Sequence, residues 1–113
     1  MVWHLVLMKP RADLAVADAE ALIAALKQAI HAIPTVRELR VGRRVMHGAQ
    51  YENLAPDSAD FMVSMGFDDL AALQTYLQHP AHEELAARFY RSLSSALVYD
   101  FEGGGIEVLD ALV

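Results

Sequence analysis

The stretch VWHLVLMK, residues 2–9, sets the fold that the sequence predicts. Branched and apolar side chains dominate it and Pro10 ends it, which is typical of a β-strand. Alternate side chains of a strand point to opposite faces of a sheet, and here both faces are apolar except for His4 and the terminal Lys9. The strand therefore needs a covering layer on each side, and the rest of the chain has to supply at least one of them.

Residues 14–33 supply a helix. Apolar side chains recur there at steps of three and four positions, with polar side chains such as Lys27 between them. That periodicity predicts an amphipathic helix, which Asp13 would cap and Pro34 would end. The next segment, residues 35–46, alternates imperfectly, which predicts a strand with a bulge near Gly42.

The second half of the chain alternates between strand and helix in the same way. Asp68 can cap a short helix, and Pro80 separates that helix from the next one. The expected elements are a loop at 47–58, a strand at 59–67, helices at 68–77 and 80–95, and a strand at 96–102. The order β-α-β-β-α-β predicts a ferredoxin-like α+β fold with an antiparallel sheet, and we expect one domain over residues 1–113.

Two helices can cover only one face of such a sheet. The predicted strand at 59–67 is apolar on both faces, like the strand at 2–9. A second copy of the chain is the economical cover for the bare face, so we expect a homodimer in which sheet packs on sheet. Three glycines at 103–105 precede an apolar end, and we expect the tail formed by residues 103–113 to reach the partner.

Composition excludes several classes of function. The formal net charge is -6 with only 9 lysines and arginines, which argues against nucleic-acid binding. No apolar run approaches the roughly 18 residues that a membrane-spanning helix needs. The chain has no cysteine, which removes disulfides and thiolate chemistry, and its start lacks the basic region of a signal peptide. We therefore expect a cytoplasmic protein that binds neither nucleic acid nor membrane.

The segment YLQHPAHEEL, residues 76–85, carries the candidate chemistry. Pro80 suits the first position of a helix, so His79 should cap that helix. His82 then lies in the first turn on the apolar side, where the positive end of the helix dipole disfavours an imidazolium. A neutral, half-buried His82 would accept a proton near pH 7. Tyr76, at the end of the preceding helix, can point into the same space.

His4 on the first strand is the third candidate. If its face of the strand is the helix-facing one, His4, Tyr76 and His82 converge in a cavity, which is the usual form of a ligand or catalytic site. The alternative is that each side chain only completes a hydrogen bond or fills the core. We expect no metal site here, because Pro80 prevents His79 and His82 from acting as a ligand pair on one helix.

Four segments, HLVLMK, IPTVRELRVGR, YLQHPAHEEL and YDFE, resemble in order the characteristic segments of the stress-responsive A/B barrel domain (Dabb) family, over residues 2–102. This resemblance implies a dimeric α+β barrel. It also implies the chemistry of the family's plant olivetolic acid cyclase, a polyketide cyclase and lyase that needs no cofactor. In that chemistry His82 would remove a proton between two carbonyls of a linear poly-β-keto thioester, Tyr76 would orient the substrate, and His4 would assist.

Other functions stay open on the same fold. One is a non-enzymatic, stress-responsive dimer that binds a small apolar ligand in its pocket. Another is a cofactor-independent monooxygenase of the antibiotic-biosynthesis type, although the expected position of Trp3 on the dimer face counts against it. Some plant members of the family bind a hard cation through backbone carbonyls at the segment that matches 33–36, and residue types alone do not test this.

Overall fold

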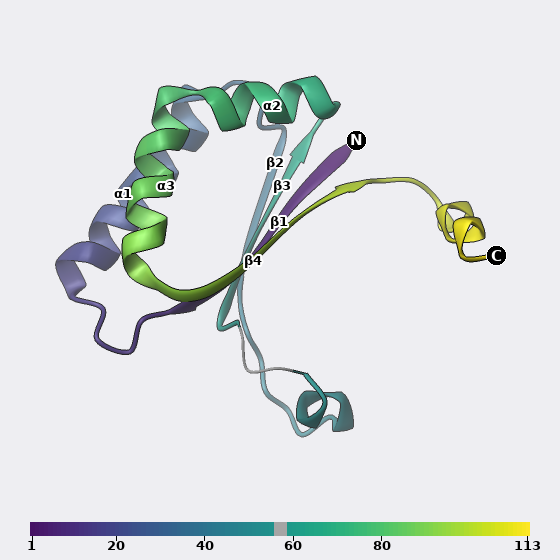
Figure 1. Cartoon of the computed structure of the whole chain (residues 1–113), viewed down its shortest axis with the longest axis horizontal. Helices are drawn as coiled ribbons and strands as arrows, with labels where there is room; N and C mark the ends of the chain where they lie inside the picture. Colours follow the sequence, from purple (N-terminus) through teal and green to yellow (C-terminus); the bar gives the residue numbers. More distant parts are fainter. Residues whose placement is uncertain (56–58) are drawn as a thin grey trace.

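A computed structural model describes residues 1–55 and 59–113 of the chain. It has one sheet with its helices gathered on one side, as Figure 1 shows. The two short 3₁₀ helices are labelled η. The elements in chain order are β1 (Val2–Pro10), α1 (Val16–Ala32), β2 (Glu38–Arg43), η1 (Gln50–Asn53), β3 (Phe61–Phe67), α2 (Leu70–Gln78), α3 (Pro80–Ser92), β4 (Leu93–Glu102) and η2 (Ile106–Leu112).

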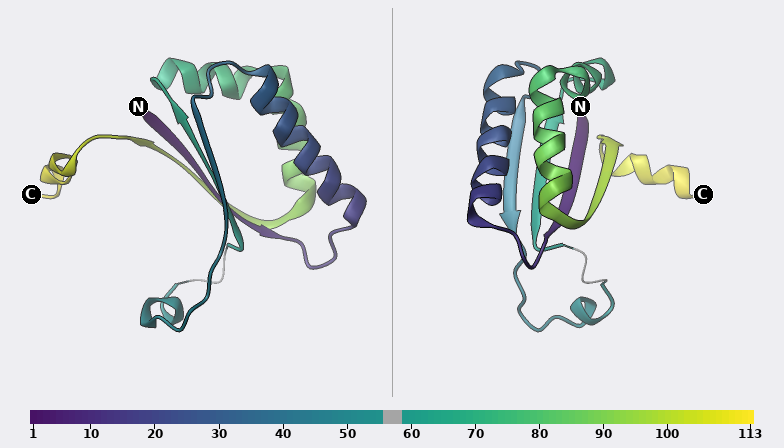
Figure 2. Two further views of the ribbon diagram at one scale, coloured as in Figure 1. Left: turned by 180° about the vertical axis from the view of Figure 1, so that it is seen from behind. Right: turned by 60° about the vertical axis from the view of Figure 1, so that its left-hand side comes forward.

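The sheet confirms the predicted topology. Its strands are antiparallel and run in the order β2-β3-β1-β4, which is the ferredoxin-like arrangement of a β-α-β-β-α-β chain. The helices α1 and α3 lie side by side over one face, and α2 lies across one end (Figure 2). In the described residues, all three α-helices lie on one side of the sheet and none covers the opposite face, so the fold consists of one α-helix layer on one sheet.

Two predicted helix caps are wrong. Asp13 does not cap α1: its carboxylate pairs instead with Arg11 at 3.1 Å, and α1 begins at Val16 without a side-chain cap. Asp69, and not Asp68, caps α2, because its Oδ1 accepts the backbone N–H of residue 72 at 2.8 Å. Asp68 forms an ion pair with Arg37 at 3.0 Å. Neighbouring aspartates satisfy the same sequence rule, and only the backbone geometry selects between them.

The predicted bulge near Gly42 is also wrong. The pairing of β2 with β3 is continuous from Glu38 to Arg43, and the one register shift of the sheet lies between Lys9 and Pro10, where β1 pairs with β4. A Cβ on Gly42 would lie 3.2 Å from Cγ of Met62 on the neighbouring strand. The glycine therefore makes room for a side chain of β3 rather than for an extra residue.

The remaining boundaries differ by a few residues. β4 begins at Leu93 rather than at residue 96, so α3 is shorter than expected. The predicted loop at 47–58 contains the 3₁₀ helix η1, and its last part, residues 56–58, lies outside the described residues.

The core lies between the helix layer and the sheet. On β1, His4 and Val6 are buried on the helix side, as the alternation predicted. Small residues on α1, Ala25 and Ala29, are buried where this helix meets α3. The buried apolar side chains are Val6, Ala25, Ala29, Ile33, Val63, Met65, Phe67, Leu73, Tyr76 and Leu85.

The face of the sheet without helices, which we call the open face, is largely apolar. Alternation and register place on it Trp3, Leu5 and Leu7 of β1, Met62 of β3, and Leu97, Tyr99 and Phe101 of β4. About half of the surface of Tyr99 (51%) and of Phe101 (51%) is exposed. The sheet alone therefore leaves aromatic and aliphatic surface in contact with solvent.

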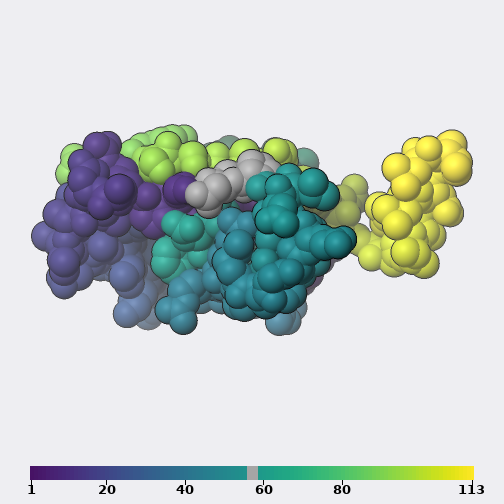
Figure 3. Space-filling view, turned by 90° about the horizontal axis from the view of Figure 1, so that it is seen from below, coloured from purple at the N-terminus to yellow at the C-terminus, as the bar shows by residue number. Residues whose placement is uncertain are grey.

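The C-terminal segment extends away from the sheet on the side of the open face (Figure 1) and stands apart from the body of the molecule (Figure 3). Its apolar side chains are exposed, with Ile106 and Leu112 both at 81%. Gly103 begins this segment, and a Cβ there would lie 2.7 Å from the indole Nε1 of Trp3. Only glycine lets the chain leave the sheet so close to this ring.

Candidate functional site

A large cavity lies between the helix layer and the sheet. Its volume is about 1250 Å³. Apolar side chains of α1, α3, β1, β2 and β3 form most of its wall. The residues with polar side chains in the wall are His4, Lys27, His31, Tyr76, His82 and Tyr90. A cavity of this size and lining suits a small, mainly apolar molecule.

His4 reaches this cavity from β1 and is held from behind by a carboxylate. Its Nδ1 lies 2.6 Å from Oδ1 of Asp100, the residue that faces it on β4. Because a carboxylate only accepts hydrogen bonds, Nδ1 of His4 carries the proton in this contact. Nε2, on the opposite side of the ring, is left to act in the cavity.

Tyr76 lies between the two candidate histidines. Its ring centroid is 6.0 Å from that of His4 and 4.8 Å from that of His82, both in edge-on geometry. The side chain is only 1% exposed, and this burial raises the pKa of Tyr76 to about 12. The phenol therefore stays protonated at neutral pH and can donate a hydrogen bond to a ligand oxygen.

The proline between His79 and His82 separates the two residues as predicted. His79 is the N-cap of α3, where its Nδ1 accepts the backbone N–H of Ala81 at 3.0 Å. His82 lies one turn further on and lines the cavity. Burial, and then the nearby charge of His4, lower the pKa of His82, while a smaller effect of the Leu77 backbone acts in the opposite direction.

The structure thus brings together all three residues that the sequence singled out: His4, Tyr76 and His82. In chemical terms the group contains a histidine that favours its neutral form, a protonated phenol, and a second histidine oriented by a carboxylate. These are the parts needed to remove a proton from carbon and to stabilise the oxyanion that results.

Sequence reasoning missed two residues of the site. Asp100 is one of two acidic residues in the strand YDFE, but its partner depends on how β1 and β4 pair. Lys27 was interpreted only as a polar residue of the α1 face, and the structure places it in the cavity wall. His31 is exposed and also contributes to the wall.

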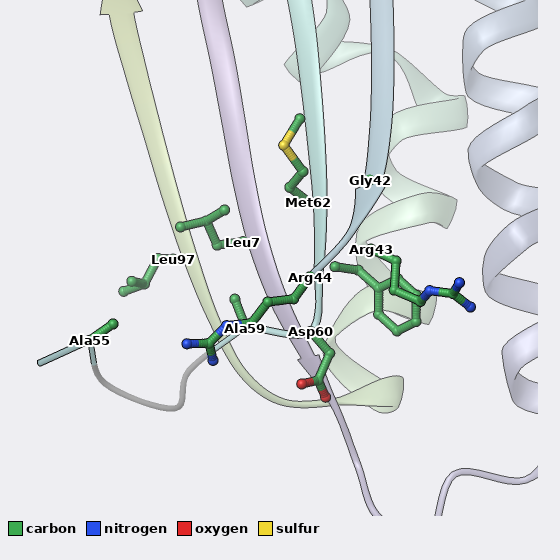
Figure 4. A pocket seen from close by; sticks show the side chains of 10 residues that line it. Leu7, Gly42, Arg43, Arg44, Ala55, Ala59, Asp60, Met62 and Leu97 are labelled. Atoms are coloured by element: carbon green, nitrogen blue, oxygen red, sulfur yellow. The ribbon is translucent and has the colours of Figure 1, made fainter. Parts of the chain in front are cut away.

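A second hollow, of about 500 Å³, lies on the other side of the sheet. Leu7 and Leu97 point into it from β1 and β4, away from the helices, as Figure 4 shows. Arg44 and Ala55, on the segment that follows β2, border it. None of the candidate histidines and tyrosines lines this hollow, so it belongs to the open face and not to the candidate site.

Residues 1–55 and 59–113 contain no group of three or more His, Asp or Glu side chains that could hold a metal ion. Within the same residues no helix is both long and apolar enough to cross a membrane.

Fold and cavity together define a ferredoxin-like α+β domain with titratable side chains gathered at an apolar pocket. The family model of the stress responsive A/B barrel domain matches residues 2–103, and the chain belongs to this family. A search of curated proteins finds no match.

Solved structures show the same fold. A hypothetical protein of Arabidopsis thaliana is 26% identical, with 93% of this chain and 89% of that one aligned at a TM-score of 0.72. A dimeric ferredoxin-like protein of unknown function from Bacteroides fragilis is 25% identical over 90% and 95% of the two chains, at a TM-score of 0.62. The hydroxynitrile lyase of Passiflora edulis is similar in fold, with 16% identity over 92% and 94% and a TM-score of 0.77.

Proposed function

We propose that this protein is a cofactor-free acid/base enzyme of the polyketide-cyclase-like lyase type, which removes a proton next to a carbonyl of a small, mainly apolar substrate. The observation that supports it best is the contact of His4, Tyr76 and His82 within one apolar cavity. In a core that only needed filling, three adjacent titratable side chains would be a costly choice.

Each side chain has a role that its surroundings favour. His82 accepts the proton as the C–H bond breaks, and the electron pair moves onto the carbonyl oxygen to give an enolate. The Tyr76 hydroxyl donates to that oxygen, and His4, fixed by Asp100, supports the developing charge. The enolate carbon then forms a C–C bond with a ketone carbon of the same substrate, and the proton held by His82 passes to the new alkoxide. No external oxidant, reductant or cofactor is needed for this sequence.

The second candidate function is non-enzymatic binding of a small apolar ligand. The cavity itself favours it, since most of its wall is apolar and would hold such a ligand without any reaction. The monooxygenase alternative lacks this support: Trp3 lies on the open face and does not line the cavity.

We also propose that a second copy of the chain covers the open face. The exposed apolar side chains of β4 support this, and solved structures of the same fold are described as dimeric. The tail of residues 103–113 extends on the same side and would contact the partner.

The test is turnover of a linear poly-β-keto thioester, followed by the appearance of the cyclised aldol product. Wild type should turn it over, and His82→Ala should lose at least about a hundredfold in rate, the usual share of a general base. The control is His47→Ala, because His47 is exposed and bonds only within its own loop to Tyr51 at 3.0 Å. Equal rates for wild type and His82→Ala would refute the proposed enzymatic function. Ligand binding without turnover would favour the second candidate, a non-enzymatic binding protein.

A further inference from the structure

The titratable side chains of the cavity wall are all basic or phenolic. The chain has 15 aspartates and glutamates and a net charge of -6, yet among residues 1–55 and 59–113 no acidic side chain lines the cavity. The carboxylate nearest to the candidate residues, Asp100, bonds to His4 and is not itself part of the wall. A wall of this kind disfavours cationic ligands and leaves anionic ones without a repelling group.

Lys27 is the one lysine or arginine among the described residues of the cavity wall. It follows the apolar cavity residues Leu22 and Leu26 on α1, and it is itself exposed, which places its ammonium at the solvent side of the cavity. His31 is four residues further along the helix and therefore lies on the same side of it. Among the residues that the structure describes, no carboxylate forms an ion pair with Lys27.

We propose that the ligand of this cavity is an amphiphilic acid, with an apolar body inside and one anionic group, a carboxylate or a phosphate, bound by Lys27 at the mouth beside His31. This deepens the proposed function and rests on it, since it takes the same cavity as the substrate site. The apolar wall lowers the local dielectric, which strengthens an ion pair at its edge relative to one in open water. The anionic group also fixes which end of the molecule faces Tyr76 and His82.

The probes are decanoate and decan-1-ol, which share a chain and differ in charge. Isothermal titration calorimetry at pH 8 and low salt should show that wild type binds decanoate about tenfold more tightly than decan-1-ol. This ratio corresponds to one charge-assisted contact. Lys27→Gln should remove most of this difference and leave the affinity for decan-1-ol unchanged. Lys27→Arg should keep the preference for decanoate over decan-1-ol. Arg91→Gln, which removes an exposed cation of α3 outside the cavity wall, should keep it too.

Decyl phosphate, the phosphate counterpart of decanoate, distinguishes the two anionic groups. If it binds more tightly than decanoate, the site is assigned to phosphate esters; if it binds more weakly, the site is assigned to carboxylates. Equal affinity of wild type for decanoate and decan-1-ol, or a preference that survives Lys27→Gln, would overturn the inference while the cavity remained a ligand site. Failure of every probe to bind would overturn both this inference and the substrate site assumed in the proposed function.

Discussion

At the scale of single residues, the environment of each candidate side chain matters more than its type. Of the five histidines of the chain, only His4 and His82 have rings packed against the ring of Tyr76 in the described residues. His4 is distinguished by Asp100 behind it, and His82 by the burial that lowers its pKa. A carboxylate that orients one imidazole while a neighbouring imidazole stays neutral gives two chemically different histidines within one pocket.

The titration of His82 can be measured without any substrate. Its folded-state pKa lies below the ordinary value of 6.5, so the unfolded chain binds that proton more readily. The free energy of unfolding should therefore fall as pH drops from 6.5 through the lowered pKa. An NMR titration of the His82 imidazole protons should show a midpoint below 6.5 in wild type.

The matched variant is His4→Gln, which removes the charge of His4 but leaves His82 buried. Its midpoint for His82 should move upward but stay below 6.5, because burial is the larger cause. A wild-type midpoint at or above 6.5 would contradict the neutral-base role of His82.

At the scale of elements, the junction of α2 and α3 positions the site. Tyr76 is near the end of α2 and His82 is in the first turn of α3, so the break at Pro80 turns the two rings toward one another. The carbonyl of His79 accepts the N–H of His82 at 2.9 Å, which ties the cap to the catalytic candidate. A continuous helix through this segment would present Tyr76 and His82 on different faces.

Loss of the His79 cap should therefore affect stability and the geometry of the site together. His79→Ala removes the acceptor for the Ala81 N–H and should lower the free energy of unfolding by about 1 kcal/mol in urea denaturation. His79→Asn, which keeps an acceptor at the cap, should retain most of the stability. Equal losses in the two variants would show that the imidazole acts through packing and not through the cap.

At the scale of the whole molecule, the sheet has one face that covers a cavity and one that is bare. The helix layer covers the first, while the open face and the protruding C-terminal segment expose apolar side chains that the proposed second copy would cover (Figures 1 and 3). Gly66, opposite Trp3, and Gly103 both lie close to that indole, so the edge of the open face is shaped around one aromatic side chain.

A charge placed on the open face should separate the dimer. Tyr99→Asp puts a carboxylate opposite Leu5, on the edge strand β4 of this face, and should shift light scattering at micromolar concentration from dimer to monomer. The control is Val16→Asp, which makes the same kind of change at an exposed position (73%) at the start of α1, in the helix layer. A wild-type monomer at this concentration would refute the proposed assembly.

What the sequence by itself determined is the order of the elements, the two apolar faces of β1, and the separation of His79 from His82 by Pro80. These features depend on side-chain periodicity and on the geometry of proline, which act over a few residues. What only the tertiary structure decided is the carboxylate that serves His4 and the cation at the mouth of the cavity. Asp100 is 96 residues from His4 along the chain, and the β1–β4 register pairs them, while Lys27 joins the site through the placement of α1 over the sheet. Both depend on the packing of whole elements, which no local pattern records.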